Sequence, residues 1–430
     1  MTASSISLSY GRGHMAVALP EGAVPTIVRK RPLAKIADPL AAIEAAFANP
    51  IGSPPLAELA RGRRSACIVI CDITRPVPNG LFLGPMLRTL LAAGIPQDRI
   101  DILIATGLHR PNLGDEMAEL VGDPWVLANF RVQNHDARDE AAHIDLGPTP
   151  TRGTPVKLDR VLVEADLRIA TGLVEPHFMA GWSGGRKVIA PGVAHHETIR
   201  TFHSARFMAD PLAVQCNLIG NPLHEEQLEI VKRLGEVHAL NTVLDEERDL
   251  VCVTFGEIIA SHAAAVDFAG SATRIALPHK FSTLVTSSAG YPLDKTYYQT
   301  IKGMVTPLDI LAPGGTLIMV SECSEGFGSP EFRDAQARLV ELGPDRFLAT
   351  LTAKSLAEID EWQSQMQLKP MRAGRVELFT TGLAGEDLRL TGVHPIDDVT
   401  GAIAGSIARS GDPRVAVIPE GPYVIPYAAA

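Results

Sequence analysis

Short apolar runs alternate with helical stretches through the first half of the chain. Residues 66–71 and 100–105 are largely apolar runs, typical of buried parallel strands. Between them, residues 81–93 have a helical periodicity that ends at a glycine and a proline. Two further strands are predicted at 166–171 and 249–255. Because strands that alternate with helices are typical of α/β proteins, the pattern predicts an α/β fold with mainly parallel sheets.

The same pattern restarts after about residue 275, which predicts a second, smaller α/β domain and an active-site cleft between the two. Its predicted strands and helices lie at 281–287, 294–304, 316–320, 331–342, 354–365 and 375–380. A last strand, at 415–419, is expected to pack back on the first domain. We therefore divide the chain into an N-terminal domain (1–275), a C-terminal α/β domain (276–405) and a tail (406–430).

The composition argues against several classes of protein. With 46% apolar and 20% charged residues, the 430-residue chain can form sizeable cores. Its formal charge of −10 disfavours a general nucleic-acid partner. The five cysteines include no C-x-x-C pair, so neither a disulfide framework nor a cysteine-rich zinc module is supported. Without a secretory signal or an apolar window of about 18 residues, we expect a cytoplasmic protein with no membrane partner.

Polar residues follow three of the predicted strands directly. Asp72 and Arg75 come after the first strand, His109 after the second and His177 after the third. Ligands of open parallel sheets bind beyond the carboxyl ends of the strands, so these residues indicate a catalytic N-terminal domain. Because the usual pKa of histidine lies near neutral pH, two histidines can act as a general base and a general acid. The alternative is that both are ordinary hydrogen-bonded histidines.

The sequence Ser183-Gly184-Gly185-Arg186-Lys187 is a glycine-rich basic loop. Its backbone N–H groups and two cations would suit a phosphate or a carboxylate. It is not a Walker motif, and no G-x-G-x-x-G follows a strand, so a dinucleotide site has no support. A surface turn with solvated charges is an equally good interpretation of the loop alone.

The neighbouring pair His195-His196 is expected to be structural. On a helix, adjacent side chains diverge, so the two rings are not predicted to face one site. No H-E-x-x-H or other zinc-binding spacing is present around them.

Taken together, these motifs resemble the nickel-dependent lactate racemases and the related 2-hydroxyacid racemases and epimerases. The resemblance spans most of the chain, and its order and spacing make the set specific. The segments that carry it are Asp72-x-Thr74-Arg75-Pro76, Thr106-Gly107-x-His109-Arg110, Glu175-Pro176-His177, the 183–187 loop, His203, Tyr298-Gln299-x-x-Lys302 and Trp362.

The resemblance implies a nickel-pincer nucleotide, which is a pyridinium-3-thioamide-5-thiocarboxylic acid mononucleotide carrying Ni(II). It places the covalent thioamide tether on Lys187, the protein ligand to nickel on His203, and the acid–base pair on His109 and His177. Substrate binding is assigned to Arg75, Tyr298, Gln299 and Lys302. Cofactor binding is assigned to Asp72, Thr74, Trp182, Ser183, Gly184, Gly185, Arg186 and Trp362, besides Lys187.

The activity implied is inversion of C2 of a 2-hydroxy acid by hydride removal and return, because loss of that hydrogen as a proton would place a carbanion beside a carboxylate. The substrates implied range from lactate and malate to larger or aromatic acids and aldonates. Expected partners are cofactor-biosynthesis and loading proteins, with a possible homo-oligomer. The alternatives are a non-catalytic cofactor-binding protein and a zinc hydrolase using His177, His195, His196 and His203.

Overall fold

The computed structural model describes residues 5–429, and the N-terminal domain is built on a six-stranded sheet of order β13-β12-β9-β4-β5-β6. All neighbours are parallel except the edge pair β12 and β13. The four strands predicted here are confirmed within two residues at each end. The strands are β4 (Ala66–Cys71), β5 (Ile100–Ala105), β6 (Arg131–Asn134), β9 (Leu167–Leu173), β12 (His238–Leu244) and β13 (Leu250–Glu257).

Helices cover both faces of this sheet, because successive side chains of a strand point to opposite sides. Ile68 and Ile70 of β4 pack with α1 (Pro39–Ala48), α2 (Leu56–Ala60) and α3 (Asn79–Ala92). Val69, between them, belongs to the core on the other face, with α7 (Arg186–Ile189) and α10 (Pro222–Leu234). A sheet buried on both faces holds the carboxyl ends of its strands in fixed positions.

The C-terminal domain is built on a second six-stranded sheet, of order β18-β17-β16-β15-β19-β3, in which every neighbouring pair is parallel. The strands predicted here are also present. The sheet contains β3 (Val24–Ile27), β15 (Phe281–Ser287), β16 (Leu311–Val320), β17 (Arg375–Phe379), β18 (His394–Pro395) and β19 (Arg414–Ile418).

Both ends of the chain join this second sheet, which corrects the proposed division. The tail strand β19 lies between β15 and β3 in this sheet, and residues 421–423 after it contact Pro176–His177 of the N-terminal domain. The strand β3, placed by chain order in the N-terminal domain, pairs with β19. The last strand, β20 (Ile425–Ala428), pairs with β14 (Arg274–Leu277). The reason is parallel pairing between segments almost 400 residues apart, which local patterns do not reveal.

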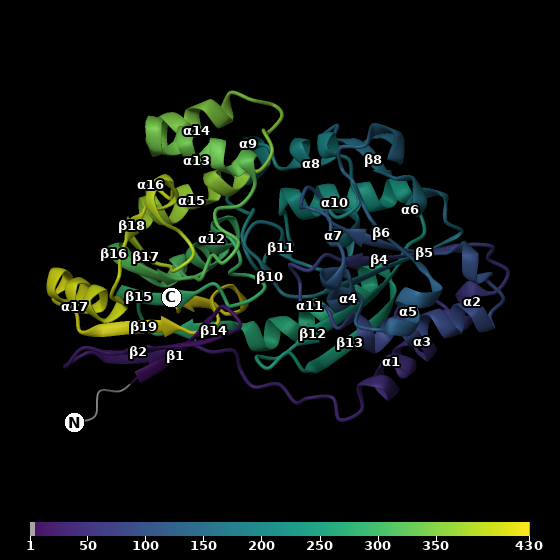
Figure 1. The fold of residues 1–430 in the computed structure, drawn as a ribbon, viewed down its shortest axis with the longest axis horizontal. Coiled ribbons are helices and arrows are strands. Elements are labelled where there is room, and N and C mark those ends of the chain that lie inside the picture. The colour runs from purple at the N-terminus through teal and green to yellow at the C-terminus, as the bar shows by residue number, and fades with distance from the viewer. Residues whose placement is uncertain (1–4, 430) are drawn as a thin grey trace.

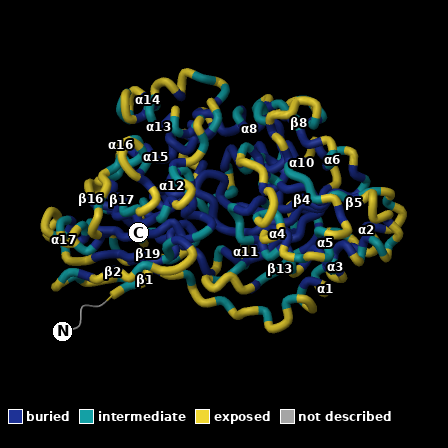
Figure 2. Tube along the Cα trace, in the orientation of Figure 1, coloured by how far each residue is buried: buried dark blue, intermediate teal, exposed yellow. Residues whose placement is uncertain are grey.

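Helices α12 (Tyr297–Val305) and α15 (Glu361–Ala373) of the C-terminal domain lie on the side that faces the N-terminal domain (Figure 1). Figure 2 shows that the chain is mostly buried where the two domains meet. Within residues 5–429, no helix has the length and apolarity needed to span a membrane. The other larger elements are β1 (Ser5–Tyr10), β2 (Gly13–Ala18), α4 (Asp115–Val121), α5 (Pro124–Asn129), β7 (His143–Pro148), β8 (Pro155–Asp159), α6 (Arg160–Glu164), α8 (His196–Phe202), α11 (Ile258–Thr273), α13 (Pro330–Leu342), α14 (Pro344–Thr352), α16 (Gly385–Leu390) and α17 (Val399–Ser410).

Candidate active site

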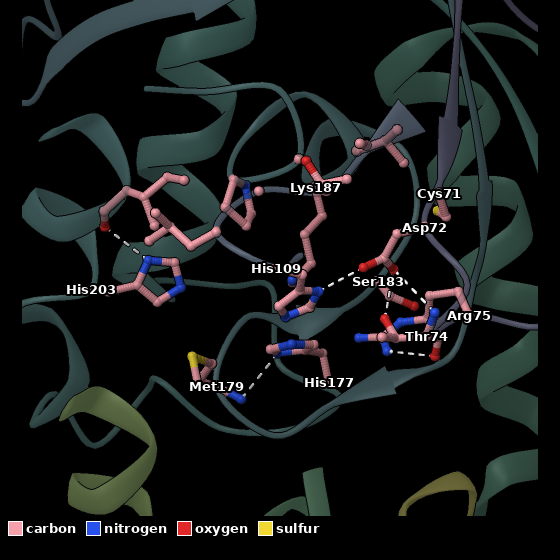
Figure 3. Close-up of a pocket in the computed structure, with 18 of the residues that line it drawn as sticks. Cys71, Asp72, Thr74, Arg75, His109, His177, Met179, Ser183, Lys187 and His203 are labelled. Carbon is pink, nitrogen blue, oxygen red and sulfur yellow. Dashed lines mark hydrogen bonds and ion pairs between the residues drawn. The ribbon is translucent and has the colours of Figure 1, made fainter. Parts of the chain in front are cut away.

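A cavity of about 130 Å³ lies at the carboxyl ends of β4, β5 and β9, where α12 and α15 approach from the other domain (Figure 3). It brings together most of the residues predicted from the sequence, although they come from separate segments of both domains. Those that line it are Asp72, Thr74, Arg75, His109, His177, Ser183, Gly184, Lys187, His203, Tyr298, Lys302 and Trp362.

Asp72 holds His109 in one orientation. The Nδ1 atom of His109 lies 2.6 Å from Asp72 Oδ2, and the hydroxyl of Thr74 donates to Asp72 Oδ1 at 2.6 Å. Burial acts to raise the pKa of Asp72, but the charge of His109 and these hydrogen bonds outweigh it and keep the pKa below its usual value. An ionised Asp72 accepts the Nδ1 proton, so the Nε2 atom of His109 is left with a lone pair that can accept a proton.

His177 is set up in the opposite way. Its Nδ1 atom accepts hydrogen bonds from the backbone N–H groups of Met179 and Ala180, at 3.4 and 3.2 Å. Burial, with the charges of Lys187 and Lys302, lowers its pKa well below the usual value, so the ring is neutral. A neutral ring that accepts at Nδ1 carries its proton on Nε2. In these tautomers the Nε2 atom of a neutral His109 accepts a hydrogen bond in the cavity, and the Nε2–H group of His177 donates one.

Lys187 extends into the cavity from the short helix α7, toward His109 and His177 (Figure 3). Burial lowers the pKa of its amine to about 7, and the charges of Arg75 and Arg186 act in the same direction. A large share of this amine is therefore uncharged at neutral pH, which is the form that can bond covalently to a cofactor.

Two N–H groups of the loop before Lys187 are used within the protein and are not offered to an anion. The N–H of Ser183 donates to the carbonyl of Glu175 at 2.9 Å, and the N–H of Gly185 donates to Asn241 Oδ1 at 3.1 Å. The glycine is needed for another reason. Gly185 has a φ of +47°, and a Cβ atom there would lie 2.8 Å from the ring of His262. The loop is thus a tight turn that places Lys187.

Two predicted cofactor contacts of this segment point away from the cavity. The guanidinium of Arg186 is buried and donates to the carbonyls of Trp182 and Ala180, both at 2.9 Å. Burial lowers its pKa to about 9. The Trp182 ring packs with apolar side chains that include Val174 and Ala265. Arg186 therefore supplies the donor that these buried carbonyls need, and Trp182 fills an apolar space. Both residues stabilise the turn without lining the cavity.

His203 has the geometry of a metal ligand. It ends α8, and its Nδ1–H donates to the carbonyl of Ile199 at 2.9 Å, which leaves the Nε2 lone pair for a metal. Burial lowers its pKa to about 3, so the ring is neutral. The ring of Trp362 lies 4.8 Å from it. Within residues 5–429, His203 belongs to no group of three protein ligands that could hold a metal ion.

The C-terminal domain closes the cavity with Tyr298 and Lys302, which lie one helical turn apart on α12. The Trp362 indole N–H donates to the Tyr298 hydroxyl at 3.1 Å. Burial lowers the pKa of Lys302 well below its usual value, with Arg75 and Lys187 adding to the effect. Lys302 and Arg75 thus face one cavity from opposite domains, an arrangement suited to a carboxylate.

Gln299 does not converge with Lys302 as predicted. It lines a neighbouring cavity of about 540 Å³, which shares Asp72, His109 and Tyr298 with the first one. The side chains at positions 298 and 302 share a helix face at i and i+4, and this turns Gln299 toward the adjoining space.

Two buried carboxylates of the site are not among the predicted residues. Glu175 pairs with Arg75 at 3.1 Å, and Asp360 lines both cavities. Asp360 has a left-handed backbone, with a φ of +62°, and accepts a hydrogen bond from Ser329 at 2.5 Å. Glu175 belongs to the Glu-Pro-His motif, so the sequence could have predicted it as a site residue from its position beside His177. No local sequence pattern indicates that Asp360 belongs to the site.

His195 and His196 do not line the cavity, so the alternative zinc site with His177 and His203 is not assembled. The two rings nevertheless lie 4.1 Å apart, which differs from the predicted divergence. The reason is that His195 is the N-cap of α8 and has an extended backbone. Its Nδ1 accepts a hydrogen bond from the N–H of Glu197 and caps the helix, and its Nε2 lies 2.8 Å from Glu140. Burial lowers the pKa of His195 to about 4, so the ring is neutral and carries its proton on Nε2, next to this carboxylate.

Comparison with known proteins gives matches across both domains. The lactate racemase N-terminal domain model matches residues 10–215, and the lactate racemase C-terminal domain model matches residues 278–425. The lactate racemase of Lactiplantibacillus plantarum is 33% identical over 391 residues, which cover 89% of this chain and 90% of the relative. That of Thermoanaerobacterium thermosaccharolyticum is 31% identical, over 98% of this chain and 99% of the relative.

Solved structures agree with this likeness. The lactate racemase apoprotein from Thermoanaerobacterium thermosaccharolyticum superposes with a TM-score of 0.89 at 28% identity, over 98% of this chain and all of that one. A Thermotoga maritima protein superposes with a TM-score of 0.70 at 18% identity, over 93% of this chain and all of that one, and shows the fold alone.

Proposed function

The chain belongs to the lactate racemase family of isomerases, and from this premise we propose that it inverts C2 of a 2-hydroxycarboxylate with a nickel-pincer nucleotide. The observation that carries the proposal is the convergence of Lys187, His203, His109 and His177 on one cavity. When bound, the cofactor would supply the acceptor and donor for the hydrogen on C2.

The residues present fit this group. Lys187 offers a partly uncharged amine for the covalent thioamide, and His203 offers a fixed imidazole lone pair that would serve as a protein ligand to nickel. One imidazole together with soft sulfur donors of the cofactor would suit Ni(II). The Trp362 ring beside His203 adds an apolar wall for a flat ring. Loading of the cofactor by separate proteins is part of the proposal.

The chain itself binds the substrate and moves the proton. Arg75 and Lys302 hold the carboxylate from the two domains. The Nε2 atom of His109 takes the hydroxyl proton of one enantiomer, and Asp72 stabilises the imidazolium that results. His177 serves the other enantiomer. To act as a base, it must move its proton to Nδ1, so the backbone at Met179 and Ala180 must give up its hydrogen bonds.

The test is intact-mass spectrometry of protein made with nickel and the cofactor pathway, followed by a chiral screen of 2-hydroxy acids. We expect added mass at Lys187, which Lys187→Ala lacks, and racemisation of at least one acid. Substrate deuterated at C2 should keep its label during racemisation. Release of the label into water would favour enolisation, and zinc without added mass at Lys187 would contradict the proposal.

A further inference from the structure

Arg75 is held from behind by a buried carboxylate that does not touch the main cavity. The Nε atom of Arg75 lies 3.1 Å from Glu175 Oε1, and the two side chains are only 14% and 11% exposed. Arg75 lines the cavity of the candidate site, and Glu175 lines a separate cavity of about 350 Å³. Both also line a third cavity of about 10 Å³, together with His177 and Lys302. The ion pair therefore forms part of the wall between the first two cavities.

The contacts of the Arg75 guanidinium leave one end free for a ligand. Its Nε edge faces Glu175, and its Nη1 group donates to the carbonyl of Thr74 at 3.2 Å. In the part of the chain that the structure describes, the Nη2 group of Arg75 has no hydrogen-bond or ion-pair partner. Because a guanidinium is planar and rigid, fixing two of its nitrogens fixes the direction of the third. That direction is set by Glu175.

Glu175 also lies close to positive charge. Burial raises the pKa of Glu175, and the charge of Arg75 opposes this most strongly, followed by that of Lys302. The second oxygen of Glu175, Oε2, is buried without a hydrogen-bond partner within residues 5–429. An ionised Glu175 compensates the charge of Arg75, and its removal would leave the buried Arg75 without its ion-pair partner.

We propose that Glu175 is a positioning residue, which holds Arg75 by its Nε edge so that Nη2 meets the carboxylate of the substrate. The inference rests on the proposed function, because it assumes a carboxylate ligand in this cavity. Glu175 acts through Arg75 and does not contact the ligand. Its effect must therefore disappear when Arg75 is absent, which a merely structural role would not require.

The experiment is a double-mutant cycle on the cofactor-loaded enzyme with Glu175→Gln, Arg75→Ala and the double variant. The readouts are the Kd of oxamate, a non-reacting carboxylate probe, and the KM and kcat of racemisation. We expect Glu175→Gln to weaken oxamate binding and raise KM about 10-fold, the scale of a charge-assisted hydrogen bond. In the Arg75→Ala background the same change should have no further effect.

A matched control is Glu226→Gln, because Glu226 is fully buried beside Arg152 and does not line the cavity. It should leave the Kd of oxamate unchanged. Equal oxamate binding by wild type and Glu175→Gln, or additive losses in the double variant, would overturn the inference. If wild type binds oxamate but racemises no acid, the proposed function fails, and the cycle still decides the role of Glu175. A wild type that does not bind oxamate overturns the inference about Glu175, whereas the chiral screen of 2-hydroxy acids still decides the proposed function.

Discussion

Replacing Asp72 by Asn tests whether this carboxylate sets the proton of His109. The pair is 2.6 Å long and Asp72 is buried, so the amide removes a charge-assisted hydrogen bond without changing the size of the side chain. Such bonds contribute about 1.5–3 kcal/mol. If Asp72 mainly stabilises the imidazolium form of His109 that proton transfer produces, its replacement by Asn should lower kcat about 10- to 150-fold. The assay is racemisation of each enantiomer by cofactor-loaded enzyme, followed by chiral chromatography.

The chain provides a matched control for this variant. Asp159 Oδ2 lies 2.9 Å from Nδ1 of His135, and this second buried pair does not line the cavity. Asp159→Asn should therefore leave kcat unchanged. The mass added at Lys187 must be the same in both variants. The reasoning is refuted if Asp72→Asn keeps full kcat, or if it loses activity only because it no longer holds the cofactor, which is the role implied by the resemblance.

Three further variants or conditions test other parts of the site. His177→Gln keeps a hydrogen-bonding group but cannot transfer a proton, so kcat should fall at least about 100-fold with either enantiomer; near-normal rates would remove His177 from the mechanism. With a pKa of about 7, Lys187 of the apoprotein should react with an amine-reactive ester only about 10-fold faster at pH 8 than at pH 6, whereas an ordinary lysine gains about 100-fold, as peptide mapping would show. Arg186→Met leaves two buried carbonyls unpaired at a cost of about 1–3 kcal/mol each, so Tm should fall while folded protein still gains mass at Lys187. Lost attachment at an unchanged Tm would instead make Arg186 a cofactor ligand.

The strands that carry the site were predictable because each is a short apolar run with a clear end. β4 and β5 coincide with the predicted ranges, and the residues after them line the cavity. β12 was not predicted, because His238 and Asn241 interrupt its apolar pattern. β3 has four residues and includes a proline, and its partner lies near the other end of the chain. Long-range pairing of this kind leaves no local signal.

Within the site, most of the residues could be predicted from the sequence, but their hydrogen-bond partners could not. The resemblance assigns Asp72 to cofactor binding, but its partner in the structure is His109, which is 37 residues away in the chain. The glycines of the 183–187 loop are compatible in sequence with an anion-binding loop or a surface turn, and the structure shows that Gly185 allows a close approach to His262. A motif records which residues occur together, whereas a hydrogen-bond partner depends on which strand ends are neighbours. Because β4 lies between β9 and β5, Arg75 meets Glu175 while Asp72 meets His109, and the order of the sheet decides both pairs.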